Sequence, residues 1–143
     1  MAETFTIESG QVGPDGERAS LRLRPHDANY FLAEAQSAGL HATAQINSGA
    51  RRGFAWEGFG EFFTGIAANW KGWTGRREWR SLEGDLKLDA ENGGSGPVSI
   101  GIYLHCRAPA QWKVQFAISI ESARLDQLAA EARSFEKLAL SAT

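Results

Sequence analysis

The sequence predicts an α+β fold: a two-layer sandwich in which a mostly antiparallel sheet of about six or seven strands carries two amphipathic helices on one face. Several segments alternate apolar and polar residues with the period of a strand, and two others repeat apolar residues with the period of a helix. Short links join consecutive strands, which favours antiparallel pairing. Because the strands keep one polar side, a single covering layer is enough.

In the first third of the chain, short strands are predicted near residues 5–7 and 21–23, on either side of a turn at Pro14-Asp15-Gly16. Residues 29–47 are ambiguous, because their Ala, Leu and Glu content favours a helix. Their second half alternates strictly, with Leu40, Ala42, Ala44 and Ile46 on one side. We therefore predict a hairpin that turns near Ser37-Ala38-Gly39.

Two helices are predicted from stripes of apolar residues. The first stripe indicates a helix of about 15 residues that ends at Gly72, and it consists of Phe59, Phe62, Phe63, Ile66, Ala67 and Trp70. The second stripe follows Ser122, a candidate N-cap, and consists of Leu125, Leu128, Ala129, Ala132, Phe135 and Leu138.

Three strands of an antiparallel meander are predicted between residues 82 and 120. Their apolar sides begin at Leu82, Val98 and Trp112, and the middle strand ends at Cys106. Tyr103 and His105 lie on the opposite, polar side. With no repeat or linker, residues 1–143 form one α+β domain.

The composition excludes several classes of partner. The formal net charge is -2 and the pI is about 5.9, which favours neither nucleic acid nor an anionic membrane. No run of 18 apolar residues is present, and the N-terminal residues lack the apolar stretch of a signal peptide. With Cys106 as the single cysteine, we expect a cytoplasmic protein.

The residues that carry chemistry indicate neither catalysis nor a cofactor. His105 and Cys106 are neighbours on a strand and face opposite sides, so they cannot share a metal ion. Glu83, Asp85 and Asp89 lie on one face at alternate positions, with neighbours about 7 Å apart and Lys87 interrupting the row. This arrangement suits acid–base chemistry, but a solvated sheet face gives the same pattern. The sequence contains no nucleophile elbow, phosphate-binding loop or dinucleotide motif. We therefore predict no catalytic residue and no metal.

The tryptophans allow two interpretations, a ligand platform or a clasp that closes the core. Trp70 and Trp112 fall on apolar sides and are predicted to be core residues. Trp73 follows Gly72, where an apolar residue folds back on the helix end. Trp79 leads into the next strand, where a large ring can fill the edge between helix and sheet. Because large aromatic residues are mostly buried, the clasp is favoured.

The pattern W-K-G-W-T-G-R-R-E-W-R-S-L-E-G-D-L over residues 70–86, followed by G-P-V-S-I at 96–100 and W-K-V at 112–114, resembles a family of small actinobacterial proteins of unknown function. The resemblance extends from Phe59 to Leu138 and is loose over the first 50 residues. Pro97 stands where that family often has a histidine. The resemblance implies no activity and no catalytic residue.

The leading functional hypothesis is a non-enzymatic module that binds a protein partner, similar in size and type to the immunity proteins of bacterial toxin systems. Its binding surface would be the polar sheet face and nearby loops, with His41, Arg51, Arg52, Arg76, Arg77, Tyr103 and His105. The alternative is a small-molecule binder or weak hydrolase with a pocket between helices and sheet, lined by Trp56, Trp73, Glu83, Asp85 and Tyr103. A merely solvated face, with homodimerisation as the sole interaction, is the third reading.

Overall fold

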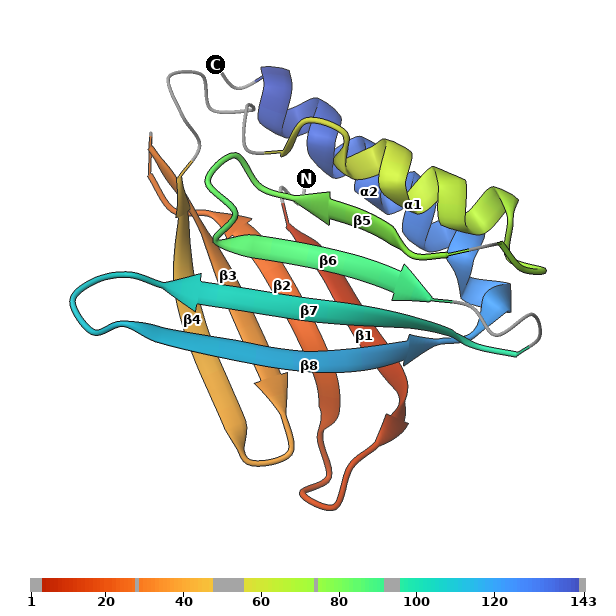
Figure 1. Ribbon diagram of the computed structural model, residues 1–143, viewed down its shortest axis with the longest axis horizontal. Coiled ribbons are helices and arrows are strands. Elements are labelled where there is room, and N and C mark those ends of the chain that lie inside the picture. Colours follow the sequence, from red (N-terminus) through yellow and green to blue (C-terminus); the bar gives the residue numbers. More distant parts are fainter. Residues whose placement is uncertain (1–3, 28, 48–55, 74, 92–95, 142–143) are drawn as a thin grey trace.

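The computed structural model describes residues 4–27, 29–47, 56–73, 75–91 and 96–141. The described residues form eight strands and two α-helices, with a 3₁₀ turn at Ser122–Arg124 (Figure 1). In chain order these are β1 (Phe5–Val12), β2 (Arg18–Pro25), β3 (Tyr30–Ser37), β4 (Leu40–Asn47), α1 (Phe59–Ala68), β5 (Arg77–Arg80), β6 (Leu86–Glu91), β7 (Val98–Cys106), β8 (Trp112–Ile120) and α2 (Leu125–Ser141).

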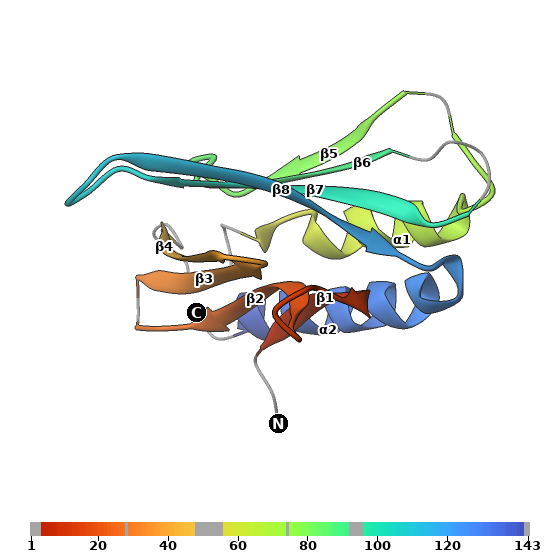
Figure 2. The ribbon, with the colours of Figure 1, turned by 90° about the horizontal axis from the view of Figure 1, so that it is seen from below.

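The strands form two antiparallel four-stranded sheets, β1-β2-β3-β4 and β5-β6-β7-β8. The sheets lie one above the other with their strands crossing steeply, and α1 and α2 lie side by side, α1 next to β5 and α2 next to β1 (Figures 1 and 2). The α+β class is confirmed, whereas a single sheet of six or seven strands under two helices is wrong. Alternation identifies the apolar side of each strand but not the layer that covers it, and here each sheet covers the other.

Aromatic rings connect both sheets to both helices. Trp56 is fully buried, and its ring centroid lies 5.0 Å from that of Phe31 on β3 and 5.7 Å from that of Trp79 on β5. It lies equally close, at 5.0 Å, to the ring of Phe135 on α2, and Phe59 of α1 lies 4.9 Å from Trp79. Such pairs contribute about 0.5–1.5 kcal/mol each beyond the area they bury. The cluster therefore holds the two sheets and the two helices together.

Helix α1 is shorter than its apolar stripe predicts. It ends at Ala68, where the carbonyl of Gly65 accepts a hydrogen bond from the side chain of Asn69 at 2.9 Å in addition to the helical one from its backbone N–H. The five buried apolar residues of the predicted stripe that lie within the helix face the core, but Trp70 falls beyond it and is 43% exposed. The prediction of Trp70 as a core residue is wrong for this reason.

The start of α1 is capped from α2 rather than from its own sequence. The carboxylate of Glu136 accepts hydrogen bonds from the backbone N–H groups of Gly58 and Gly60, at 3.2 and 2.7 Å. A negative charge is favourable at a helix N-terminus, where these N–H groups have no partner within the helix. Gly60 also allows close approach, since a Cβ there would lie 3.0 Å from Arg133 Cα.

The second sheet begins with a strand that alternation does not predict. β5 is only four residues long, and of these only Trp79 is buried. The turn that follows separates β5 from β6: Gly84 N–H donates to the carbonyl of Ser81, and Ser81 N–H donates to the carbonyl of Leu86. Leu82 therefore lies on a turn, 57% exposed, instead of on the apolar side of a strand.

Three smaller expectations at the strand ends also need correction. Cys106, predicted on the apolar side, is half-buried at the end of β7, and its thiol donates to the carbonyl of Ala108. Trp112 is half-buried against the core instead of within it. Ser122 is the first residue of the 3₁₀ turn and not an N-cap, since Arg124 N–H donates to the carbonyl of Glu121. The hairpin turn at residues 38 and 39 is confirmed.

Candidate functional site

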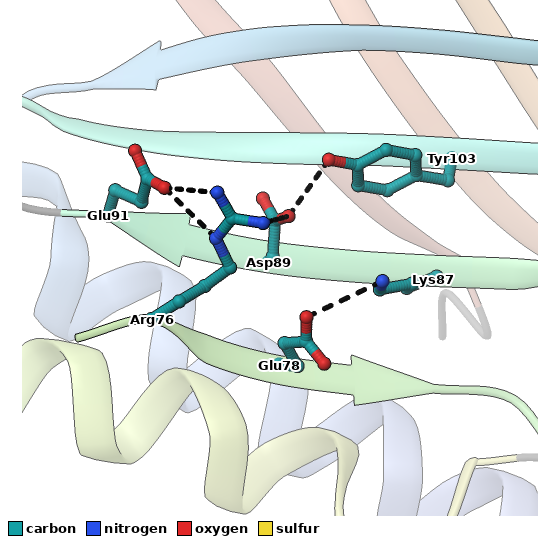
Figure 3. Close-up of polar contacts among 6 residues, drawn as sticks. All are labelled: Arg76, Glu78, Lys87, Asp89, Glu91 and Tyr103. Carbon is teal, nitrogen blue, oxygen red and sulfur yellow. Dashed lines mark hydrogen bonds and ion pairs between the residues drawn. The ribbon is translucent and has the colours of Figure 1, made fainter.

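A buried carboxylate lies on the outer side of the second sheet (Figure 3). In β6, Leu88 and Ala90 point into the core, so Asp89 between them points outward. Asp89 is nevertheless only 6% exposed. Its register partner on β7 is Gly101, and the carboxylate occupies the space where a side chain at Gly101 would lie. Glycine at position 101 is thus the one residue type that leaves room for the Asp89 carboxylate.

Tyr103 covers Asp89 from the next outward position of β7. Its hydroxyl donates a hydrogen bond to Asp89 Oδ2 at 2.9 Å, and Lys87 Nζ lies 5.2 Å from the ring centroid (Figure 3). This hydrogen bond, with partial burial, raises the pKa of Tyr103 above its ordinary value of 10.0. Both contacts hold the ring in one orientation on the outer face.

Arg76 covers Asp89 from the β5 side. Its guanidinium donates to Glu91 Oε1 from Nε at 2.9 Å and from Nη2 at 2.5 Å, and its Nη1 lies 3.6 Å from Asp89 Oδ2 (Figure 3). The hydrogen bonds to Glu91 and the charges of Glu91 and Asp89 raise the pKa of Arg76. The guanidinium of Arg76 thus bridges the carboxylates of Glu91 and Asp89.

The outer side of β5–β8 around these residues is called the Tyr103 face, and it carries excess positive charge at one end. Glu78 forms an ion pair with Lys87 at 3.4 Å. Arg80 stands directly opposite Lys87, a pairing of like charges that costs stability. Among the described residues, Arg80 and Lys113 form no ion pair.

A shallow hollow of about 400 Å³ lies at the centre of the Tyr103 face. Gly101 and Ala117, which pair across β7 and β8, form its floor. Arg76, Tyr103 and Gln115 line it, together with the acidic residues Asp89 and Glu91. The small floor residues make the face concave, so a protruding group can contact the side chains around it.

A second polar cluster lies at the end of β7. Asp85, 8% exposed, accepts a hydrogen bond from Arg107 Nε at 2.8 Å, and His105 Nδ1 lies 4.0 Å from the same oxygen. Glu83 contributes its backbone carbonyl to Arg107 while its side chain is exposed. Glu83 lies in the turn before β6, so the predicted row of Glu83, Asp85 and Asp89 along one strand is wrong.

The predicted binding residues on polar strand positions separate onto two surfaces. Tyr103 and His105 lie on the Tyr103 face, whereas His41 lies on the outer side of the first sheet. There it borders a hollow of about 620 Å³ with Thr6, Arg22 and other polar residues. One polar face holding His41, Tyr103 and His105 together is therefore wrong. Arg51 and Arg52 lie outside the described residues.

The residues predicted to line a pocket between helices and sheet do not come together at one place. Trp56 is enclosed by aromatic rings, and Tyr103 points away from it on the outer side of β7. Trp73 is half-buried against the core, with the guanidinium of Arg77 5.4 Å from its ring centroid. Arg77 is half-buried on the inner side of β5, unlike Arg76. Trp79 is buried and its Nε1 donates to the carbonyl of Glu57, which confirms the clasp.

The residues that sequence reasoning missed as a binding site are Asp89, Glu91, Lys87 and Gln115, together with the floor at Gly101. The one available signal was Gly101, a glycine at an outward strand position opposite an acidic residue. Among the described residues, no group of three or more His, Cys, Asp or Glu side chains could hold a metal ion. No helix in the described ranges is both long and apolar enough to cross a membrane.

The fold and the Tyr103 face define an α+β sandwich with an ordered polar surface. The chain belongs to DUF6228, a family of unknown function whose model matches residues 14–138. No curated protein and no solved structure matches the chain.

Proposed function

We propose that the protein is a non-enzymatic interaction module that binds an acidic surface of a protein partner with the Tyr103 face. The observation that carries the proposal is the burial of Asp89 on the outward side of a sheet, where it fixes Tyr103 and Arg76. A solvated face needs no buried carboxylate, and burying a charge costs free energy unless hydrogen bonds compensate it. The compensation here orders two side chains of the types that dominate binding energies at interfaces.

Order in the free protein favours binding, because less side-chain entropy is lost when the complex forms. Tyr103 is held by Asp89 and Lys87, and Arg76 is held by Glu91 and Asp89. The hollow beside them accepts a protruding group from the partner.

The charges support an acidic partner. Arg80 and Lys113 form no ion pair with a described residue. Arg80 also lies directly opposite Lys87, and a bound carboxylate would relieve the repulsion between these two cations. The single Cys106 is consistent with action in a reducing compartment.

Site-specific photocrosslinking in the cells of origin tests this function. A photoreactive residue replaces Gln115 at the hollow, and in a matched control it replaces Thr6, which is exposed on the first sheet. We expect one protein to be crosslinked from position 115 and not from position 6, and Lys113→Glu to abolish the crosslink. With that protein purified, Lys113→Glu should weaken binding at least about tenfold and Thr6→Glu should leave it unchanged.

The proposal fails if positions 115 and 6 capture the same proteins. It also fails if charge reversal at Lys113 leaves the crosslink and the affinity unchanged.

A further inference from the structure

In the part of the chain that the structure describes, the two sheets present four edge strands, and two of them, β5 and β1, are clearly protected against pairing with another chain. β5 is four residues long, three of them charged, and contacts α1. The ladder between β1 and β2 shifts register between Glu8 and Val12, and β1 contacts β8, which carries Lys113. Short length, charge and irregular register are the ordinary means by which proteins block edge strands.

β4 is neither short nor charged nor irregular in register, although it contacts β7 of the second sheet. Its eight residues, LHATAQIN, include no charged residue and no proline. All eight pair with β3 in one uninterrupted register. β4 is the last strand of its sheet, and its outward side chains at His41, Thr43 and Gln45 are exposed. A long, regular and uncharged edge is a template for a further strand.

We propose that β4 pairs antiparallel with β4 of a second copy of this chain, so that two first sheets join into one continuous sheet of eight strands. The proposal is independent of the partner-binding function, which uses the other sheet. The two-fold axis passes beside Thr43, and the same surface is used by both copies.

The sequence of β4 is complementary to itself in this register. On the inner side Leu40 meets Ile46 of the second copy and Ala42 meets Ala44. On the outer side Thr43 meets Thr43, a favourable cross-strand pair, and His41 meets Gln45. Apolar side chains thus meet apolar ones on the inner side, polar side chains meet polar ones on the outer side, and no like charges are brought together. Leu40 and Ala42, which are half-buried in one copy, become more buried when the two strands pair.

Sedimentation and spin labelling test the pairing. We expect the wild-type chain to sediment at twice its 15.6 kDa mass. Thr43→Lys places two ammonium groups at the axis and should raise the dimer dissociation constant at least about tenfold. The matched control, Ser20→Lys, lies on the same side of the central strand β2 and should leave the dimer intact.

Spin labels keep the test decisive if Thr43→Lys fails to fold. In a Cys106→Ser chain, spin labels on Thr43→Cys should strongly broaden each other's electron paramagnetic resonance spectra, because neighbouring strands lie about 5 Å apart. Labels on Ser20→Cys should lie more than about 24 Å apart, five strand spacings across the joined sheet. A wild-type chain that is monomeric at all concentrations would overturn the pairing. So would a dimer that is unaffected by Thr43→Lys, or one whose labels at 43 do not interact.

Discussion

The outer faces of the two sheets differ although their strands alternate in the same way. On the first sheet, the polar residues around His41 and Arg22 border a hollow without any buried charged group among the described residues. On the second, Asp89 is buried beneath Tyr103 and Arg76. Alternation therefore shows which side of a strand faces outward, whereas the burial of a charge on that side distinguishes an ordered surface from a solvated one.

The edges of the two sheets also differ, and here it is the first sheet that has the feature suited to binding. The second sheet starts with a short, charged strand that contacts a helix, and the first ends with the long, uncharged β4. Each sheet thus has one feature suited to binding, a face on the second and an edge on the first. The following variants test how separate these features are.

The largest effect is expected where the two sheets share their core. Trp56→Ala removes a fully buried ring that contacts Phe31 in the first sheet and Trp79 in the second. We expect the free energy of unfolding to fall by about 3–5 kcal/mol in urea denaturation, with both sheets destabilised together. Trp70→Ala, at a ring that is 43% exposed, should cost less than about 1 kcal/mol. Equal costs would contradict the central position of Trp56.

The next largest effect separates the two outer faces. Gly101→Ala adds a Cβ where the Asp89 carboxylate lies, so the carboxylate must move and the Tyr103 hydroxyl loses its acceptor. We expect a loss of about 1–3 kcal/mol in the free energy of unfolding. Ala117→Ser, a similar increase in size on the neighbouring strand, should be within about 0.5 kcal/mol of wild type. A neutral Gly101→Ala would show that Asp89 does not depend on this space.

The pKa of Tyr103 reports on the same network. Because the pKa is raised in the folded protein, the stability that the neutral phenol contributes is present below pH 10.0 and is lost as the pH rises through the raised pKa. Absorbance titration should show a phenol that ionises above pH 10.0 in wild type and is missing in Tyr103→Phe. Asp89→Asn should lower that pKa. An unchanged pKa in Asp89→Asn would remove Asp89 as the cause.

The smallest effects are expected at the exposed ion pairs, one on each sheet. Arg24 pairs with Glu34 on the first sheet, and Lys87 pairs with Glu78 on the second. Arg24→Ala and Lys87→Ala should each cost about 0.2–1 kcal/mol, and less in high salt. A cost well above this range for Lys87→Ala alone would mean that its contact with Tyr103 matters more than its ion pair.

The sequence predicts most of the inward-facing residues, because alternation in β4, β6 and β7 and the stripes of α1 and α2 follow directly from strand and helix geometry. It does not predict the division into two sheets, since the pattern of an inner face is the same whether a sheet or a helix covers it. β5 is too short for alternation to be recognised. Trp70 is misplaced because α1 ends at Ala68, before the apolar stripe does.

The candidate site is predictable only in part, because the sequence shows which residues face outward but not which of them strand pairing will bury. Tyr103 is recognisable as a binding residue from its type and its outward strand position, and Arg76 from its place in a basic loop cluster. Asp89 is not, because an acidic residue at an outward strand position is ordinarily solvated. Its burial depends on Gly101, which is 12 residues away in the sequence and becomes its neighbour only through the pairing of β6 with β7.

A double-mutant cycle between Asp89→Ala and Tyr103→Phe tests most directly whether the buried carboxylate fixes the exposed ring. Each variant lowers the free energy of unfolding by some amount. If the two groups act as one unit, the sum of the two single losses will exceed the loss in the double variant by about 0.5–1 kcal/mol or more. Costs that add within about 0.3 kcal/mol would contradict the coupling. The Tyr103 face would then be an ordinary solvated surface.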